Sequence, residues 1–96
     1  MKDEIKYIFR LHAVRRMFQR GIDEKVIRDV LEKGETIEEY PDDAPFPSRL
    51  VLGWAGERPI HIVAADNQEA EERIIITVYE PDADQWDMTF KSRRKR

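Results

Sequence analysis

The stretch HAVRRMFQRGI, residues 12–22, decides how the first part of the chain folds. On a helix at 100° per residue, its apolar residues fall on one side and its polar residues on the other. The apolar side, counted from the preceding residue, consists of Leu11, Val14, Met17 and Phe18. The polar side, which has no carboxylate, consists of His12, Arg15, Arg16, Gln19 and Arg20. Like charges four residues apart repel one another, so this side predicts a surface that an anion covers.

A second helix is predicted directly after the first. We expect the first helix to run from about Leu11 to Arg20 and to end at Gly21, because glycine readily takes a positive φ. Asp23 is suited to cap the second helix, and Gly34 closes it. The apolar stripe of the second helix consists of Val26, Ile27, Val30 and Leu31. The prediction is an N-terminal helical hairpin with one shared hydrophobic seam.

From Glu35 the apolar residues recur with a period of two, which is typical of β-strands. Strands are predicted at residues 35–40, 49–55, 59–66 and 73–80. Residues 5–9 either add a short strand or lead into the first helix, and the tail with Trp86 and Phe90 either pairs at a sheet edge or turns helical. The predicted fold class is α+β, with the helical hairpin packed on one face of a roughly four-stranded antiparallel sheet.

Alternation also assigns the strand residues to two faces. The face predicted to receive the helices carries Leu50, Leu52, Trp54, Ile60, Ile62, Ala64, Ile74, Ile76 and Val78. The other face is predicted to stay open to solvent, and it carries Arg49, Val51, Gly53, His61, Val63, Thr77 and Tyr79.

The composition limits the function classes. The chain has 96 residues and no cysteine, so we expect one domain over residues 1–90, a basic tail at 91–96, and no disulfide or thiolate metal site. It has no apolar run of membrane-spanning length and no signal peptide, so a cytoplasmic protein is expected. The net charge of −3 argues against a non-specific coat on duplex DNA. Basic residues at both ends of the chain predict a polyanion site if the ends meet; otherwise they are a solvated helix and a frayed tail.

The available side chains suit RNA cleavage by the RNA's own 2′-hydroxyl. That reaction needs a general base, a general acid and fixed positive charge, and it needs no cofactor and no metal. The candidate catalytic residues are His12, His61, Arg16 and Tyr79. The candidate RNA contacts are Arg15, Arg16, Arg20, Lys91, Arg93 and Arg94.

Each candidate also has a structural interpretation. His12 could buttress the first helix, and Arg16 and Arg20 could pair with acids of the second helix or with Glu38 and Glu39. His61 could be a hydrogen-bonded structural histidine, and Tyr79 a half-buried strand aromatic. Trp86 is interpreted as a core residue that covers a sheet edge.

Several spaced motifs resemble a family of small bacterial proteins, domain of unknown function 4258. They are His12-Ala13-x-x-Arg16-Met17-x-x-Arg20-Gly21-Ile22, Tyr40-Pro41-Asp42-Asp43, Pro45 to Pro47, Arg58-Pro59-Ile60-His61-Ile62-Val63 and Ile76-Thr77-Val78-Tyr79-Glu80-Pro81, together with Trp86 and Arg93-Arg94. The family looks similar to the RelE-like, barnase-related toxin ribonucleases of the BECR fold. Those enzymes are metal-independent, place helices against one face of a four-stranded antiparallel sheet, and commonly sit beside an antitoxin gene.

The resemblance implies an endoribonuclease toxin of a toxin–antitoxin pair. Its partners would be RNA and a cognate antitoxin, often a small zinc-finger, helix-turn-helix protein. The residues that match the family's own motifs are His12, Arg16, Arg20, His61 and Tyr79. The alternative is a non-catalytic module with a toxin-like fold that binds RNA or protein.

Overall fold

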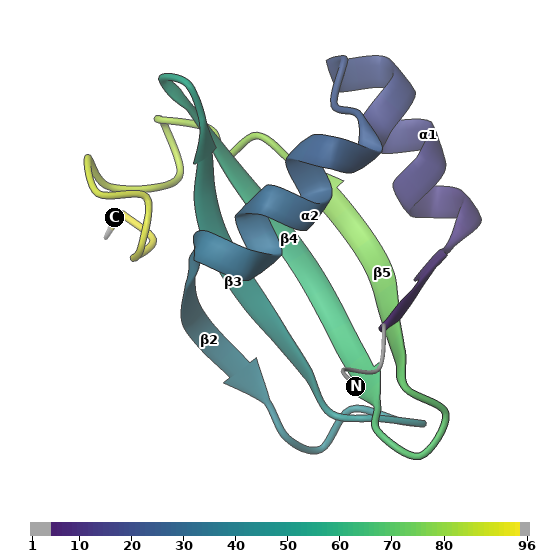
Figure 1. Ribbon diagram of the computed structural model, residues 1–96. Helices are drawn as coiled ribbons and strands as arrows, with labels where there is room; N and C mark the ends of the chain where they lie inside the picture. The colour runs from purple at the N-terminus through teal and green to yellow at the C-terminus, as the bar shows by residue number, and fades with distance from the viewer. Residues whose placement is uncertain (1–4, 95–96) are drawn as a thin grey trace.

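The computed structural model describes residues 5–94 (Figure 1). The elements follow one another as β1 (Lys6–Phe9), α1 (Leu11–Arg20), α2 (Glu24–Lys33), β2 (Glu35–Tyr40), β3 (Ser48–Ala55), β4 (Arg58–Asn67) and β5 (Glu72–Tyr79). The five strands form one sheet in the order β1-β5-β4-β3-β2. The α+β class and the positions of both helices are confirmed, and the strands fall where the period of two predicted them.

The sheet is mixed and five-stranded, so the prediction of a four-stranded antiparallel sheet is wrong. The added strand is β1, which pairs in parallel with β5 at the sheet edge. Backbone hydrogen bonds continue this pairing beyond β1, because the Arg10 N–H donates to the Ile75 carbonyl at 3.1 Å. A short, mainly apolar segment such as Lys6–Phe9 is compatible with a strand and with a segment that leads into a helix. Its local sequence does not identify β5, far along the chain, as its pairing partner.

The predicted helical hairpin is also wrong, because each helix packs mainly on the sheet. α1 lies against β5, whereas α2 lies against β3 and β4 on the same face of the sheet (Figure 1). Gly21 ends α1 with φ of 65°, and the Asp23 carboxylate accepts a hydrogen bond from the Val26 N–H at 3.0 Å. The turn is therefore as predicted, but each ten-residue helix buries its apolar stripe against strands. Helices this short depend on such packing for their stability.

The face under the helices, here called the helix face, carries smaller side chains than alternation predicted. In β3 it presents Val51 and Gly53, and a Cβ built on Gly53 would lie 2.7 Å from a Val30 methyl. Leu50, Leu52 and Trp54 point the other way, because β3 pairs Leu52 with His61 and Val51 with Ile62. Their placement under the helices was wrong. β3 is buried on both faces, so its polarity does not alternate and cannot decide between them.

A β-bulge explains the second wrong assignment. The register between β4 and β5 shifts at Val63/Ala64, so Ala64 pairs with Ile75 and Ile76 is the extra residue. Ile75 and Val78 therefore belong to the core under the helices, while Ile74 shares the opposite face with its partner Ala65. The prediction that Ile74 and Ile76 lie on the helix face is therefore wrong. The same prediction is confirmed for Ile60, Ile62, Ala64 and Val78.

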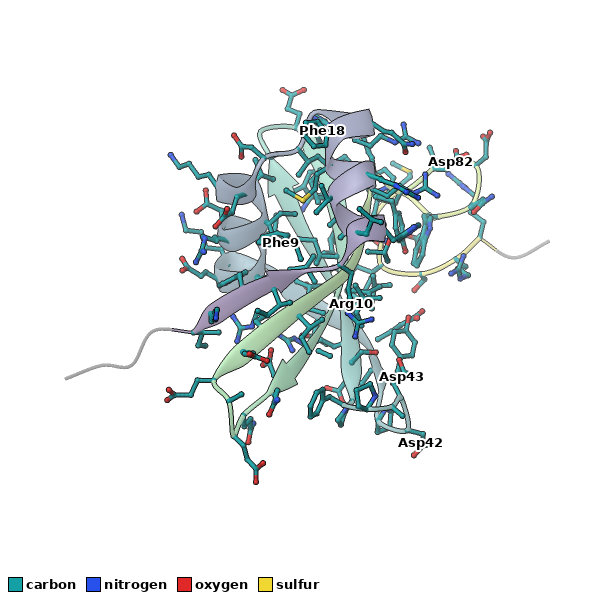
Figure 2. The ribbon with its side chains drawn as sticks, turned by 90° about the vertical axis from the view of Figure 1, so that its right-hand side faces the viewer. Phe9, Arg10, Phe18, Asp42, Asp43 and Asp82 are labelled. Carbon is teal, nitrogen blue, oxygen red and sulfur yellow. The ribbon has the colours of Figure 1, made fainter. Side chains whose placement is uncertain are left out.

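The opposite face of the sheet is partly covered by the C-terminal segment, residues 82–94, here called the strap. It folds back as an irregular hairpin in which Trp86 bridges to Arg93 and the Arg94 N–H donates to the Gln85 carbonyl at 2.8 Å. The strap begins at Asp82 and lies across the sheet from α2 (Figure 2). We call this face of the sheet the strap face. In the described part of the chain, no helix has the length and apolarity to cross a membrane.

Candidate functional site

His61 and Tyr79 lie side by side on the strap face. They are direct cross-strand partners in β4 and β5. The His61 Nδ1 and the Tyr79 hydroxyl are 3.2 Å apart, and the two rings meet edge to face with centroids 5.2 Å apart. The structure thus brings together two of the four residues that the sequence analysis proposed as catalytic.

The hydrogen bonds of His61 define its tautomer. Its Nε2 lies 2.8 Å from the Phe90 carbonyl oxygen, which only accepts hydrogen bonds, so Nε2 carries the proton. Nδ1 is then an acceptor for the Tyr79 O–H. Burial lowers the pKa of His61, with a smaller lowering from the Arg93 guanidinium, and burial raises the pKa of Tyr79. At neutral pH we therefore expect a neutral imidazole that holds the hydroxyl of a protonated tyrosine.

The strap closes over His61. The Trp86 ring stands edge to face on the imidazole with centroids 4.5 Å apart, and His61 has no exposed surface. The Arg93 guanidinium lies 4.6 Å above the Trp86 ring, and the Lys91 ammonium pairs with Glu35 at 3.0 Å. Because both ring nitrogens are used and the ring is covered, His61 does not present a free nitrogen to a substrate.

β2 adds a carboxylate and a second phenol to the same face. Glu38 pairs with Leu50 and Tyr40 with Ser48, so both lie on the strap face. The Tyr40 hydroxyl donates to the Glu38 carboxylate at 2.5 Å. Burial and then this hydrogen bond raise the pKa of Tyr40 to about 12. The sequence analysis did not propose either residue as a site residue, although their i, i+2 spacing in a strand places them on one face.

Charges on the strap and on β2 act on the histidine–tyrosine pair. The Arg93 guanidinium lowers the pKa of Tyr79, and the Glu38 carboxylate raises it. Within residues 5–94 neither Arg93 nor Glu38 forms an ion pair, so both charges remain uncommitted. We call these five residues the acid–base cluster: Glu38, Tyr40, His61, Tyr79 and Arg93.

The candidates on α1 are not part of this cluster. α1 packs on the helix face, and no hydrogen bond or ion pair among residues 5–94 joins it to the acid–base cluster. His12 and Arg15 are exposed, and Arg16 is partly exposed. At the end of the helix, the Arg20 carbonyl accepts a hydrogen bond from Arg58 at 2.8 Å. Among residues 5–94, no hydrogen bond or ion pair therefore joins the catalytic candidates His12 and Arg16 to His61.

The remaining predicted RNA contacts are divided within the strap. Only Arg93 belongs to the acid–base cluster. Lys91 is ion-paired with Glu35, and the Arg94 Nε donates to the Ala83 carbonyl at 2.7 Å. Arg94 therefore closes the strap hairpin. Arg93 is the basic residue of the strap that has no ion pair or hydrogen bond from its side chain within residues 5–94.

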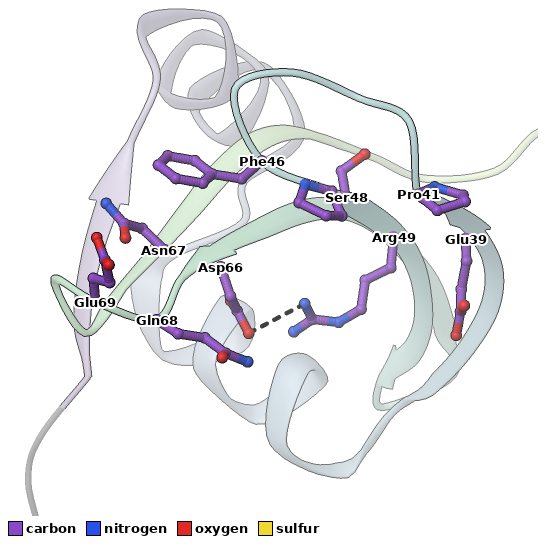
Figure 3. Close-up of a pocket in the computed structure, with 10 residues that line it drawn as sticks. Glu39, Pro41, Phe46, Ser48, Arg49, Asp66, Asn67, Gln68 and Glu69 are labelled. Atoms are coloured by element: carbon purple, nitrogen blue, oxygen red, sulfur yellow. Dashed lines mark ion pairs between the residues drawn. The ribbon is translucent and has the colours of Figure 1, made fainter.

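A separate hollow of about 550 Å³ lies beyond the loop that joins β2 to β3 (Figure 3). Its lining includes Glu39, Phe46, Arg49, Asp66 and Gln68. Arg49 and Asp66, which form an ion pair across it at 3.4 Å, belong to the helix face. The hollow therefore lies on the other face of the sheet from the acid–base cluster, and the guanidinium of Arg49 is already ion-paired. No group of three histidine or acidic side chains among the described residues could hold a metal ion.

Residues 9–80 match the family described as Domain of unknown function (DUF4258). The chain belongs to this family. Neither the curated proteins nor the solved structures include a match to the chain, so the likeness to RelE-like ribonucleases gains no support from a relative. The DUF4258 match contains Glu38, Tyr40, His61 and Tyr79 but ends before the strap. Trp86 and Arg93-Arg94, which the sequence analysis included in the resemblance, thus lie outside the matched residues.

Proposed function

We propose that this DUF4258 protein is a metal-independent endoribonuclease that cleaves RNA by attack of the 2′-hydroxyl, as the toxin of a toxin–antitoxin pair. The observation that supports this most is the acid–base cluster itself. The strap face of the sheet presents a carboxylate and two hydroxyls, and the strap adds a guanidinium; within residues 5–94 neither the carboxylate nor the guanidinium forms an ion pair. These are the groups that phosphodiester cleavage by an internal hydroxyl needs.

In the proposed reaction, Glu38 is the general base. It is an acceptor-only group. Within residues 5–94 its side-chain partner is the Tyr40 hydroxyl, so further lone pairs remain for the proton of the 2′-hydroxyl. The 2′-oxygen then bonds to phosphorus, the bond from phosphorus to the 5′-oxygen breaks, and a 2′,3′-cyclic phosphate forms. Arg93 offers planar, paired donors to the phosphate oxygens as negative charge develops.

Tyr79 is the proposed general acid. Its side chain is half-buried, and burial raises its pKa, against a smaller lowering by the Arg93 guanidinium, so the phenol is protonated and has a proton to transfer to the departing 5′-oxygen. Solvent returns a proton to the phenolate afterwards, and Glu38 releases its proton to solvent. His61 acts through Tyr79 as a positioning residue. Its Nδ1 holds the hydroxyl at 3.2 Å before the reaction, and this hydrogen bond breaks when the O–H turns to the 5′-oxygen. This assignment differs from the sequence-based one because His61 is covered.

The test uses the purified full-length chain, single-stranded RNA and a chelator, with and without ribosomes. Tyr79→Phe and Glu38→Gln should each lower the cleavage rate by about 10²–10⁴-fold, the usual effect of losing a general acid or base. Tyr7→Phe is the matched control, because Tyr7 is a half-buried strand tyrosine of the core under the helices. Absence of cleavage by the wild type, even with ribosomes, or cleavage that the chelator stops, would refute the proposal.

The alternative is an RNA-binding module without catalysis. The observation that favours it is the complete burial of His61 with both nitrogens hydrogen-bonded, which is typical of a structural histidine. Wild-type protein that binds RNA, loses this binding on Arg93→Ala and leaves the RNA intact would select the alternative. If the protein is a toxin, a cognate antitoxin is the expected partner, and an adjacent gene for a small DNA-binding protein would support it.

A further inference from the structure

The outer side of α1 exposes apolar side chains that the core does not use. Ala13 is fully buried under the helix, yet Leu11 is 64% and Phe18 is 85% exposed. Figure 2 shows Phe18 at the end of α1, at the opposite end of the helix from Arg10. One exposed apolar residue needs no explanation, but two on one helix side next to a groove indicate a contact surface.

A groove of about 450 Å³ lies beside Phe18. Its lining consists of Val14, Met17, Phe18, Gly21, Ile22 and Asp23. Asp23 is its one charged residue, and its carboxylate is already used as the cap of α2. At Gly21 an added Cβ would meet no atom within 4 Å, so the groove is open along the turn between the helices. The groove is thus apolar and accessible from outside.

The charges of α1 are also unsatisfied. In α2 and in β3–β5, the described arginines all have carboxylate partners: Arg28 with Glu24, Arg49 and Arg73 with Asp66, and Arg58 with Glu80. α1 carries Arg15, Arg16 and Arg20 with no acid of its own, and none of the three forms an ion pair within residues 5–94. Beside the apolar groove, the arginines of α1 therefore have no carboxylate partner within residues 5–94, and Asp23, which lines the groove, already caps α2.

We infer that this groove, with Phe18 and Arg15 beside it, is the docking site for an acidic amphipathic helix of a partner protein. Such a helix supplies apolar anchors at i, i+3, i+4 and i+7 for the groove and carboxylates for the arginines. A second copy of this chain is a poorer occupant, because pairing α1 with itself would set arginines against arginines. The inference stands without the proposed RNA cleavage, since the groove lies on α1 and the acid–base cluster on the strap face.

The probe is a fluorescein-labelled amphipathic peptide of about 16 residues, with leucines at the anchor spacing and glutamates elsewhere. A second peptide carries lysine at every glutamate position. We expect the acidic peptide to bind the full-length chain with a Kd of about 1–100 µM and the basic peptide to bind at least about tenfold more weakly. No binding of the acidic peptide, or equal binding of both peptides, would overturn the inference.

Variants locate the site. Phe18→Ser should weaken binding of the acidic peptide about tenfold or more, whereas Met88→Ser should leave it unchanged, because Met88 is equally exposed at 86% but lies in the strap. Arg15→Glu should weaken the acidic peptide and strengthen the basic one, while Lys33→Glu, at the far end of α2, should do neither. All four positions are exposed, so the fold is expected to survive each change.

Two other occupants are distinguished in the same series. Sedimentation that shows a dimer of the wild type and a monomer of Phe18→Ser would assign the groove to a second copy. Displacement of the acidic peptide by single-stranded RNA, with RNA binding that is itself lost on Phe18→Ser, would assign it to nucleic acid. Either result would overturn the inference of an acidic protein partner.

Discussion

Gly53 lies directly under Val30 of α2, where the helix approaches the sheet closely. A Cβ on Gly53 would lie 2.7 and 2.9 Å from the two Val30 methyls, whereas carbon atoms in contact prefer about 3.5–4.0 Å. Because this separation falls well short of an ordinary contact, Gly53→Ala forces α2 or the Val30 side chain to move. Overpacking of this kind in a closed core costs about 1–3 kcal/mol.

Val30→Ala should relieve the clash that Gly53→Ala creates. Val30 is 2% exposed, so its loss alone costs roughly 1–3 kcal/mol through the cavity that it leaves. In the double variant, the methyl group added at position 53 enters the space that the Val30 side chain vacated. We expect the double variant to be less destabilised than the sum of the single variants, by about 1–2 kcal/mol.

Urea unfolding followed by tryptophan fluorescence measures the free energies of unfolding of all three variants. The control cycle pairs Gly53→Ala with Val26→Ala, a partly buried valine of α2, and should be additive within about 0.5 kcal/mol. A harmless Gly53→Ala, or additivity with Val30→Ala, would contradict the packing of α2 on Gly53. Leu52 and its cross-strand partner His61 would then belong to the helix face.

Three further predictions concern single residues. Asp23→Ala should lower the free energy of unfolding by about 1 kcal/mol, because α2 loses its N-cap; an unchanged midpoint in thermal unfolding would contradict the cap. The pKa of His61 is lowered in the folded state from its ordinary 6.5, chiefly by burial, so the unfolded chain binds the proton more readily. The contribution of His61 to the free energy of unfolding should therefore be constant above pH 6.5 and decrease as the pH falls below 6.5. The free energy of unfolding should change by at most about 1.4 kcal/mol per pH unit. This dependence should vanish in His61→Gln, and the same dependence in that variant would assign it to other groups. Trp86→Ala removes the ring, 2% exposed, that packs the strap on His61; trypsin should then cut after Lys91 and Arg93 about tenfold faster or more, and unchanged proteolysis would show that the strap does not depend on Trp86.

The sequence predicted where the helices and strands begin and end better than it predicted which face of the sheet each strand residue occupies. Helix ends follow local signals, such as Gly21 with its positive φ and the Asp23 cap, and both are present. Face assignment needs alternation, which β3 lacks because Val51 and Leu52 are both buried. The choice between them rests on Gly53, whose missing side chain lets α2 approach. A bulge such as the one at Ile76 is likewise invisible in a run of three isoleucines.

The candidate site was predicted only where it follows from a single pair of strands. Alternation assigned His61 and Tyr79 to one face, and in the structure they are direct partners in the antiparallel pair β4 and β5, beyond the bulge at Val63/Ala64. The joining of His12 to this pair depended on where a helix sits in space, and α1 lies on the other side of the sheet. The covering of His61 by Trp86 and Phe90 depends on the return path of the strap, which no local pattern specifies.

The most direct test of the central claim is the chemical identity of the 3′ end that the protein leaves on RNA. Mass spectrometry of single-stranded RNA, incubated with the full-length chain and a chelator, distinguishes a 2′,3′-cyclic phosphate from a 3′-hydroxyl. We expect the cyclic phosphate from the wild type and from Tyr7→Phe, and its loss, by about 10²-fold or more, in Tyr79→Phe. A 3′-hydroxyl end, or a cyclic phosphate that Tyr79→Phe forms as fast as the wild type, would contradict the proposed chemistry.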